Sequence, residues 1–232
     1  TFLRDGLTRD LLGYGIDIAG MDAFLQPLYA PERMLEKQRS AMERMKENCR
    51  RLGLHFDPSV APSAGKKSEA YLLMHRELNQ YPENAARFPC IVDNTRFFWD
   101  FYANPETPFY VDETAGLPTL GEAAAAVHRA GGLAFLAHPC AYGLSKREVC
   151  GLVRDAVCAG VDGLEVFHSS HREDDALFLR ALSQAYGLFV SGGSDFHGHI
   201  KPDRALVAGS GGPRIAREDV IPWVENIRPF RP

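Results

Sequence analysis

The sequence predicts an α/β fold built on a parallel sheet, and three observations support this prediction. Short apolar segments alternate with segments of helical spacing in the C-terminal half, and two capping-box motifs mark helix starts there. No apolar run approaches the roughly 18–20 residues that span a bilayer, so the apolar segments are expected to be buried strands and helices of a globular fold. Fully buried parallel strands need helices on their outer face, and a barrel satisfies this need. We therefore expect at least part of a barrel.

The N-terminal segment predicts a strand followed by a long helix. Apolar residues dominate 10–16, which we interpret as the strand. Pro31 opens the helix at a first-turn position and Gly53 closes it. Its apolar positions recur at helical spacing: Leu35, Met42 and Cys49, with Met34, Ala41, Met45 and Leu52.

The middle of the chain predicts a mainly helical insertion. Helices are expected over 68–80 and 94–104, and prolines punctuate the connections between them. We accordingly interpret 31–106 as an insertion subdomain. Residues 1–30 and 107–232 form the barrel portion in this interpretation.

The C-terminal half alternates helices and strands. Capping boxes at Thr119-x-x-Glu122 and Ser145-x-x-Glu148 open two helices, and a third helix is expected over 172–186. Each helix precedes a short apolar strand. The expected strands are 133–137, 161–167 and 188–191.

Polar residues able to bind metals stand at the ends of these three strands. The carboxyl ends of parallel strands share one face of a sheet, so distant residues converge there. Asp oxygens and His nitrogens together suit a divalent transition metal. The sequence therefore predicts a shared metal or active site at this face. The candidates are His138 after the first strand, Glu165, His168 and His171 with the second, and Asp195 and His197 after the third.

Each candidate also has a structural alternative. Glu165 could form a buried ion pair, His168 could point away from the site, and His171 could cap the helix that follows it. Arg172 and Lys201 could meet the phosphate group of a substrate, and each could equally be a solvated surface residue. The agreement of three strand ends is what favours the functional interpretation.

The composition limits the expected cellular location and the expected binding partners. The net charge of −4 gives no overall attraction to nucleic acid or to an acidic membrane, so neither is expected as a partner. Five cysteines without a C-x-x-C pair favour reduced thiols and a cytoplasmic location. The first residues do not resemble a signal peptide, and they lack an initiating Met, so we expect a processed chain or part of a longer one.

Three stretches together resemble the PHP (polymerase and histidinol phosphatase) family of metal-dependent phosphoesterases. They are 130–139, 163–171 and 192–198, and 11–17 is similar to the family's stretch ahead of its helical insertion. The resemblance implies a distorted TIM-like (β/α)7 barrel of the PHP type, at least in part, with a mainly helical insertion.

The resemblance also implies roles for residues. His138, Asp195 and His197 would be ligands of divalent metal ions (Zn, Mn or Fe), and Glu165 and His171 would line the substrate side. Bound metal would activate a water and neutralise phosphate charge. The expected substrate is a small phosphorylated molecule, either a phosphomonoester or a nucleotide.

The chain also departs from the family pattern. The family's His-x-His, Thr-Asp-His and third-strand glutamate elements are absent, and Asp10 stands where a metal-binding His is usual. Aspartate can ligate a hard divalent ion, so Asp10 remains a candidate ligand. We expect a missing N-terminal segment or a second subunit to complete the barrel, and at most one tightly bound ion in this chain alone.

Three functional interpretations follow. The first is a hydrolase of phosphate esters that uses metal-activated water. The second is a non-catalytic PHP remnant that binds a metal, a phosphorylated ligand or a partner protein. The third, a PHP module acting on nucleic acid beside a polymerase, is disfavoured by the acidic charge and the absence of a basic stripe.

Overall fold

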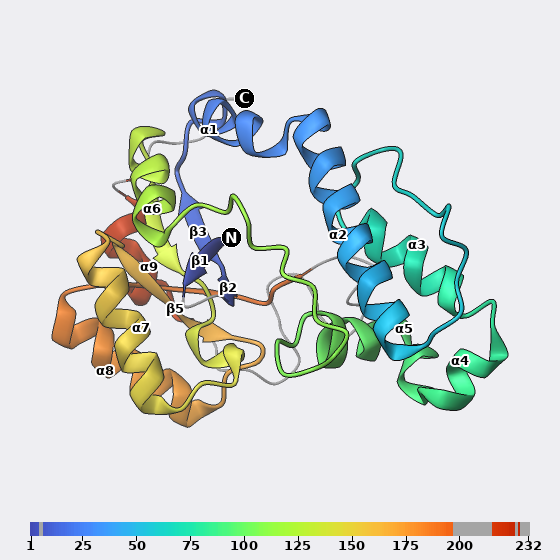
Figure 1. Cartoon of the computed structure of the whole chain (residues 1–232). Coiled ribbons are helices and arrows are strands. Elements are labelled where there is room, and N and C mark those ends of the chain that lie inside the picture. The colour runs from blue at the N-terminus through green and yellow to red at the C-terminus, as the bar shows by residue number, and fades with distance from the viewer. Residues whose placement is uncertain (5–6, 197–214, 226, 228–232) are drawn as a thin grey trace. The chain divides into compact units, whose positions relative to one another are not determined.

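The computed structural model describes residues 1–4, 7–196, 215–225 and 227 (Figure 1). Contacts within the chain separate two compact units. The sheet unit comprises Thr1–Phe24 and Leu117–Pro232, and the helical unit comprises Leu25–Gly116. The predicted insertion, 31–106, falls inside the helical unit.

The sheet unit is built on a four-stranded sheet in the order β3-β4-β5-β6. The last three strands run parallel, so the α/β class with a parallel sheet is confirmed, whereas a full barrel stays a prediction. β3 is antiparallel to β4, with Leu11 opposite Leu136. The strands are β3 (Leu11–Tyr14), β4 (Leu133–Leu136), β5 (Gly163–His168) and β6 (Phe189–Gly193).

A two-stranded antiparallel hairpin precedes this sheet and was not predicted. It pairs β1 (Phe2–Arg4) with β2 (Leu7–Arg9). Phe2 is fully buried in the core, and the Leu3 N–H donates to the Pro118 carbonyl. These contacts tie the first residues of the chain to the start of the C-terminal half.

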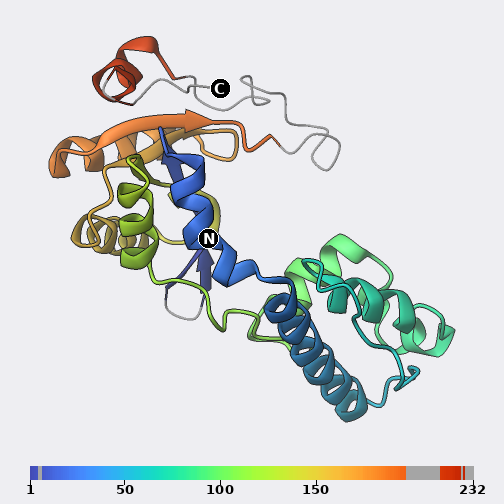
Figure 2. The same cartoon turned by 90° about the horizontal axis from the view of Figure 1, so that it is seen from above.

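Helices cover both faces of the described sheet. Figure 2 shows α9 on the side of β6 opposite to α6 and α7. Both predicted capping boxes are present, since each Glu side chain accepts the N-cap N–H while the N-cap hydroxyl accepts the Glu N–H. The helices are α1 (Ile18–Tyr29), which runs across the boundary between the units, α6 (Leu120–Arg129), α7 (Lys146–Cys158), α8 (Glu173–Tyr186) and α9 (Arg217–Val224).

Alternate residues of the strands divide between two apolar environments. Ala134, Leu136, Leu164 and Val166 belong to the core that α6, α7 and α8 complete. Phe135 projects from the other face, where its ring lies 4.9 Å from that of Trp223 in α9. The ladder pairs Phe135 with Gly163, so Glu165, two residues along β5, shares this second face.

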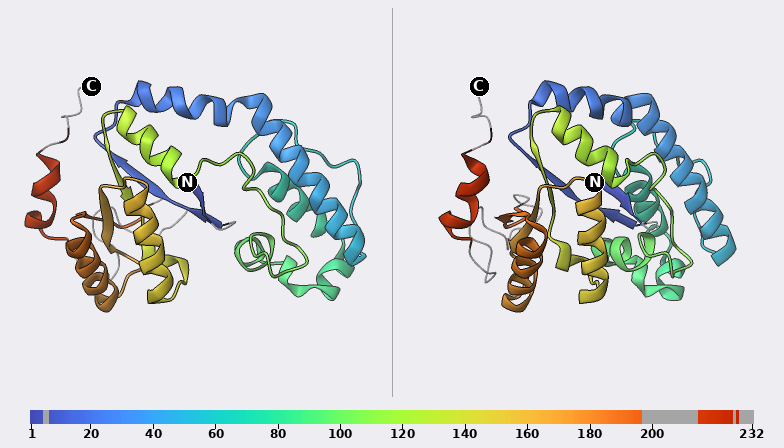
Figure 3. Two further views of the ribbon diagram at one scale, coloured as in Figure 1. Left: turned by 60° about the vertical axis from the view of Figure 1, so that its left-hand side comes forward. Right: turned by 90° about the vertical axis from the view of Figure 1, so that its left-hand side faces the viewer.

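The helical unit has its own core. Its longest helix begins at Pro31 and ends at Leu52, and Gly53 caps it in the left-handed conformation, as predicted (φ 64°). α2 and α3 lie side by side in both views of Figure 3. The elements are α2 (Pro31–Leu52), α3 (Glu69–Leu78), α4 (Pro82–Arg87), the 3₁₀ helix η1 (Pro89–Ile91), α5 (Asn94–Arg96) and the π-helix η2 (Phe97–Tyr102).

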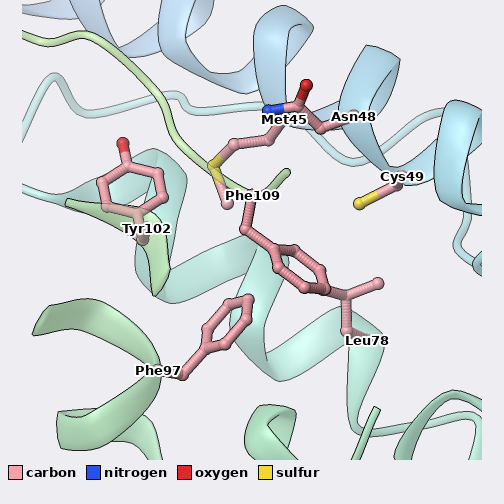
Figure 4. Close-up of a pocket in the computed structure, with 7 residues that line it drawn as sticks. All are labelled: Met45, Asn48, Cys49, Leu78, Phe97, Tyr102 and Phe109. Atoms are coloured by element: carbon pink, nitrogen blue, oxygen red, sulfur yellow. The ribbon is translucent and has the colours of Figure 1, made fainter. Parts of the chain in front are cut away.

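Apolar and aromatic side chains surround a small cavity in this core (Figure 4). The rings of Phe97 and Phe109 meet edge to face, 5.1 Å apart. Cys49 also lines the cavity, and burial raises the pKa of its thiol to about 12. The environment is therefore that of a packed core. Across the described helices, none has the length and apolar character needed to cross a membrane.

Candidate functional site

The end of β4 carries His138 on an unusual backbone. Its φ of 30° lies in the left-handed region, which a residue with a side chain adopts at a cost. The buried Glu165 of β5 stabilises this turn, because its Oε2 accepts the His138 backbone N–H at 2.8 Å. Glu165 thus orients the backbone from which the His138 ring projects, a contact that neither its expected substrate-side role nor the alternative of a buried ion pair anticipated.

Asp10, directly before β3, faces the His138 ring. The distance from Asp10 Oδ2 to His138 Nε2 is 3.9 Å, and the Asp10 side chain is half exposed. The Asp10 carbonyl accepts the Ala137 N–H at 3.1 Å, which fixes the two strand ends together. The His138 Nδ1 is buried and has no hydrogen-bond partner among the described residues. An imidazole and a carboxylate therefore face one another at this edge.

The electrostatics of the site favour a neutral His138 ring. Burial lowers the pKa of His138, and the nearby Asp10 and Asp195 carboxylates oppose this effect. The pKa of Glu165 is raised to about 7, because burial and the nearby Asp195 carboxylate raise it by more than the hydrogen bond from the His138 N–H lowers it. A neutral imidazole keeps a lone pair, which metal binding requires.

Two more histidines continue from His138 along the end of β5. Ring centroids are 5.0 Å apart for His138 and His168 and 5.3 Å apart for His168 and His171. The His168 Nδ1 accepts the Ser170 N–H at 3.1 Å. His171 is buried, and its Nδ1 lies 2.9 Å from the Val166 carbonyl, so Nδ1 carries a proton. When the ring is neutral, Nε2 then holds the lone pair, and this atom has no partner among the described residues.

The chain after β6 approaches the same edge. Asp195 has a left-handed backbone (φ 54°), like His138. The Ser169 hydroxyl donates to the Ser194 carbonyl at 3.0 Å and ties the ends of β5 and β6 together. Gly193 lies against Glu165, since an added Cβ would stand 2.7 Å from Oε1. The glycine leaves room for the carboxylate that supports His138.

The structure brings together most of the residues predicted from the sequence. Asp10, His138, Glu165 and Asp195 form one electrostatic group, and His171 continues it through His168. Arg172 is exposed at the start of α8 and is not part of this group. His197 and Lys201 lie outside the described residues.

The donor set fits a divalent ion only in part. Within the described ranges, no three His, Cys, Asp or Glu side chains stand close enough together to hold a metal. Asp10 and His138 supply one carboxylate and one imidazole, the donor types that zinc and similar ions bind. A third ligand would have to come from Asp195, after a movement toward this pair, or from His197, which lies outside the described residues.

Two residues at the site were missed in the sequence. The Tyr142 hydroxyl accepts the Asp10 N–H at 2.9 Å, and the Arg9 guanidinium lies 4.5 Å from the centroid of the Tyr142 ring. Both stand close in sequence to a predicted ligand, Arg9 beside Asp10 and Tyr142 four residues after His138. Their closeness in sequence to a predicted ligand could therefore have indicated them.

Comparison with curated proteins finds relatives that cleave phosphate esters. A 3′,5′-nucleoside bisphosphate phosphatase of Chromobacterium violaceum is 34% identical over 106 residues, which are 46% of this chain and 36% of that protein. A 5′-3′ exoribonuclease of Haemophilus influenzae is 25% identical over 185 residues, 80% of this chain and 65% of that protein. The chain thus spans less than two thirds of either relative. The exoribonuclease is in tension with the expectation that nucleic acid is not a partner.

Solved structures share the fold. An amidohydrolase from C. violaceum, determined with bound sulfate and no metal, has a TM-score of 0.58 at 22% identity and covers 90% of this chain and 70% of its own. A protein assigned as a metal-dependent phosphoesterase from Bifidobacterium adolescentis has a TM-score of 0.52 at 20% identity, covering 98% and 73%. No family model matches the chain. The curated relatives cleave phosphate esters, in line with the resemblance to the PHP family noted in the sequence, and the solved structures share the fold of this chain.

Proposed function

We propose that this chain is a metal-dependent hydrolase of phosphate esters that acts on small, nucleotide-type substrates. The observation that carries the proposal is the pairing of Asp10 with His138 at the carboxyl end of β4, beside the buried Nε2 of His171. Relatives that act on nucleoside bisphosphates and RNA support the same class of reaction.

In this proposal Asp10 and His138 would hold a divalent ion together with His197, and with Asp195 once it moves closer than it stands in the structure. When bound, the ion would supply an activated water and charge neutralisation for the phosphate. Glu165 holds the His138 backbone in its left-handed turn. This hydrogen bond fixes the main chain from which the ring projects.

His171 is proposed to bind the substrate. Its Nδ1 is committed to the Val166 carbonyl, so only Nε2 can interact with a ligand. A neutral ring accepts a hydrogen bond at Nε2, and a protonated ring donates one to a phosphate oxygen. Arg172 and Lys201 remain proposed phosphate contacts.

The test is phosphate release by the purified chain supplied with Mn²⁺, Zn²⁺ or Fe²⁺. Adenosine 3′,5′-bisphosphate and a short 5′-phosphorylated RNA serve as alternative substrates. We expect His138→Ala, Asp195→Ala and His197→Ala each to lower the rate by orders of magnitude. His128→Ala is the matched control, because that ring pairs with Asp162 at 2.8 Å, before β5 begins and therefore at its other end.

The outcomes separate the proposal from its alternative. Unchanged rates in the three ligand variants would remove these residues from the reaction. A chain that binds metal and either substrate without hydrolysing it would instead be the non-catalytic remnant. Cleavage of the RNA, but not of the bisphosphate, would make nucleic acid the substrate.

A further inference from the structure

Tyr142 contacts both members of the Asp10–His138 pair. It is the last residue of the 3₁₀ helix η3 (Pro139–Tyr142), which begins immediately after His138. Its hydroxyl accepts the Asp10 backbone N–H at 2.9 Å. Its ring centroid lies 5.2 Å from that of His138, with 58° between the ring planes. One side chain therefore bridges the strand that supplies the carboxylate and the turn that supplies the imidazole.

The Tyr142 ring is itself held in place. The Arg9 guanidinium carbon lies 4.5 Å from the ring centroid, within the range of a cation–π contact. Arg9 is buried, and its Nη1 donates to the Thr8 carbonyl at 2.8 Å. Since Arg9 directly precedes Asp10, the ring is fixed against the chain segment that carries the carboxylate.

The hydrogen bond from Asp10 to Tyr142 completes the anchoring of the Asp10 main chain. The Asp10 carbonyl already accepts the Ala137 N–H at 3.1 Å, and the ladder of β3 starts only at Leu11. Tyr142 thus binds the one remaining main-chain polar group of Asp10. With both groups bound, the half-exposed carboxylate has a fixed origin from which it reaches His138.

We propose that Tyr142 is a positioning residue, which sets the geometry of Asp10 relative to His138 for metal binding. The inference rests on the proposed function in taking this pair as metal ligands. In this role the hydroxyl acts through the Asp10 main chain and not by binding substrate or metal itself. Removing it should loosen the pair while leaving both ligand side chains in the protein.

The experiment compares Tyr142→Phe with wild type in the whole chain, using Co²⁺ as a spectroscopic probe. We expect the Co²⁺ Kd to rise by up to about 12-fold, the limit reached if the whole hydrogen-bond free energy of about 1.5 kcal/mol couples to metal binding. We also expect the visible absorption of bound Co²⁺ to change in position or intensity, because ligand geometry sets it. Tyr186→Phe, an exposed tyrosine at the end of α8, is the matched control and should match wild type.

A Tyr142→Phe protein with the wild-type Kd and spectrum would overturn the inference. An equal loss of Co²⁺ affinity in Tyr186→Phe would overturn it too, as would a wild-type chain that binds no Co²⁺. Should Tyr142→Phe fail to fold, hydrogen exchange of wild type decides, since an unprotected Asp10 amide contradicts the bond. Failure of the proposed function is a separate result. In that case wild type binds Co²⁺ but releases no phosphate, and the comparison of Kd values still holds.

Discussion

The Glu165 carboxylate accepts the backbone N–H of His138 at 2.8 Å, so a side chain in the middle of β5 supports the turn that ends β4. Glu165 is buried, and its other oxygen lies against the Gly193 backbone at the end of β6. One carboxylate of β5 therefore contacts the ends of both neighbouring strands, β4 and β6, at the candidate site. Glu165 therefore supports the backbone of the site and also contributes to its charge.

Replacing Glu165 should separate its hydrogen-bonding role from its charge. Glu165→Ala leaves the His138 N–H without its acceptor, which we expect to lower the free energy of unfolding by about 1–3 kcal/mol. Glu165→Gln keeps an oxygen at nearly the same place and should lose less. Urea unfolding of the metal-free proteins measures both changes. Equal losses in the two variants would show that the charge, and not the acceptor, stabilises the turn.

Much of the sheet unit could be predicted because its signals are local. The capping boxes at Thr119 and Ser145 form as expected, and each depends on residues only three positions apart. The strands β4, β5 and β6 are short apolar runs bounded by helices, and their order follows from the alternation. Such signals need no knowledge of distant contacts.

Elements with conflicting local signals were missed. Helix α1 contains Gly20 and Pro27, both of which disfavour helix interiors. The direction of β3 could not be predicted either, because the whole helical unit separates it from β4 and such a long connection allows both directions. Tertiary contacts decide both features.

The candidate site was predicted from strand ends, and its supporting contacts were not. His138 and Asp195 were found because polar residues directly follow apolar strands. The left-handed backbone at both positions gave no sequence signal, since neither is a glycine. Their conformations depend on partners far along the chain, as Glu165 is for His138.

Replacing Gly163 at the start of β5 should destabilise the protein. A Cβ added there would collide with the Phe135 ring, which is fully buried. We expect Gly163→Ala to lower the free energy of unfolding by about 1–3 kcal/mol, as overpacking does. Gly121→Ala is the control, because nothing lies within 4 Å of its added Cβ and alanine is preferred inside helix α6. Thermal unfolding should show the control at or above wild type, and a tolerated Gly163→Ala would contradict this packing.

Glu69 should contribute to stability at neutral pH and lose this contribution in acid. Hydrogen bonds from backbone N–H groups, that of Ser63 foremost and those of Ala64 and Lys66 with it, lower the pKa of Glu69. A carboxyl whose pKa is lower in the folded protein stabilises it above the unfolded pKa of about 4.3, and the stabilisation disappears as the pH falls through the folded pKa.

Glu69→Gln therefore tests this loop anchor through its pH dependence. We expect a lower unfolding midpoint than wild type at pH 7 and a smaller further loss between about pH 5 and 3. Glu83→Gln, at an exposed position in α4, is the control for simple loss of a negative charge. Urea unfolding at several pH values measures the effect, and parallel pH profiles for wild type and Glu69→Gln would contradict it.

Trp223 should report the packing of α9 against the sheet. Its indole N–H donates to the Val190 carbonyl at 2.7 Å, and its ring lies 4.8 Å from the Tyr14 ring. The chain has one other tryptophan, Trp99, which is 67% exposed, whereas Trp223 is 4% exposed. We expect Trp99→Phe to leave a blue-shifted emission that moves to the red on unfolding, and Trp223→Phe to leave the emission of a solvated indole. Red emission from native Trp99→Phe would show that α9 does not cover this face of the sheet in solution.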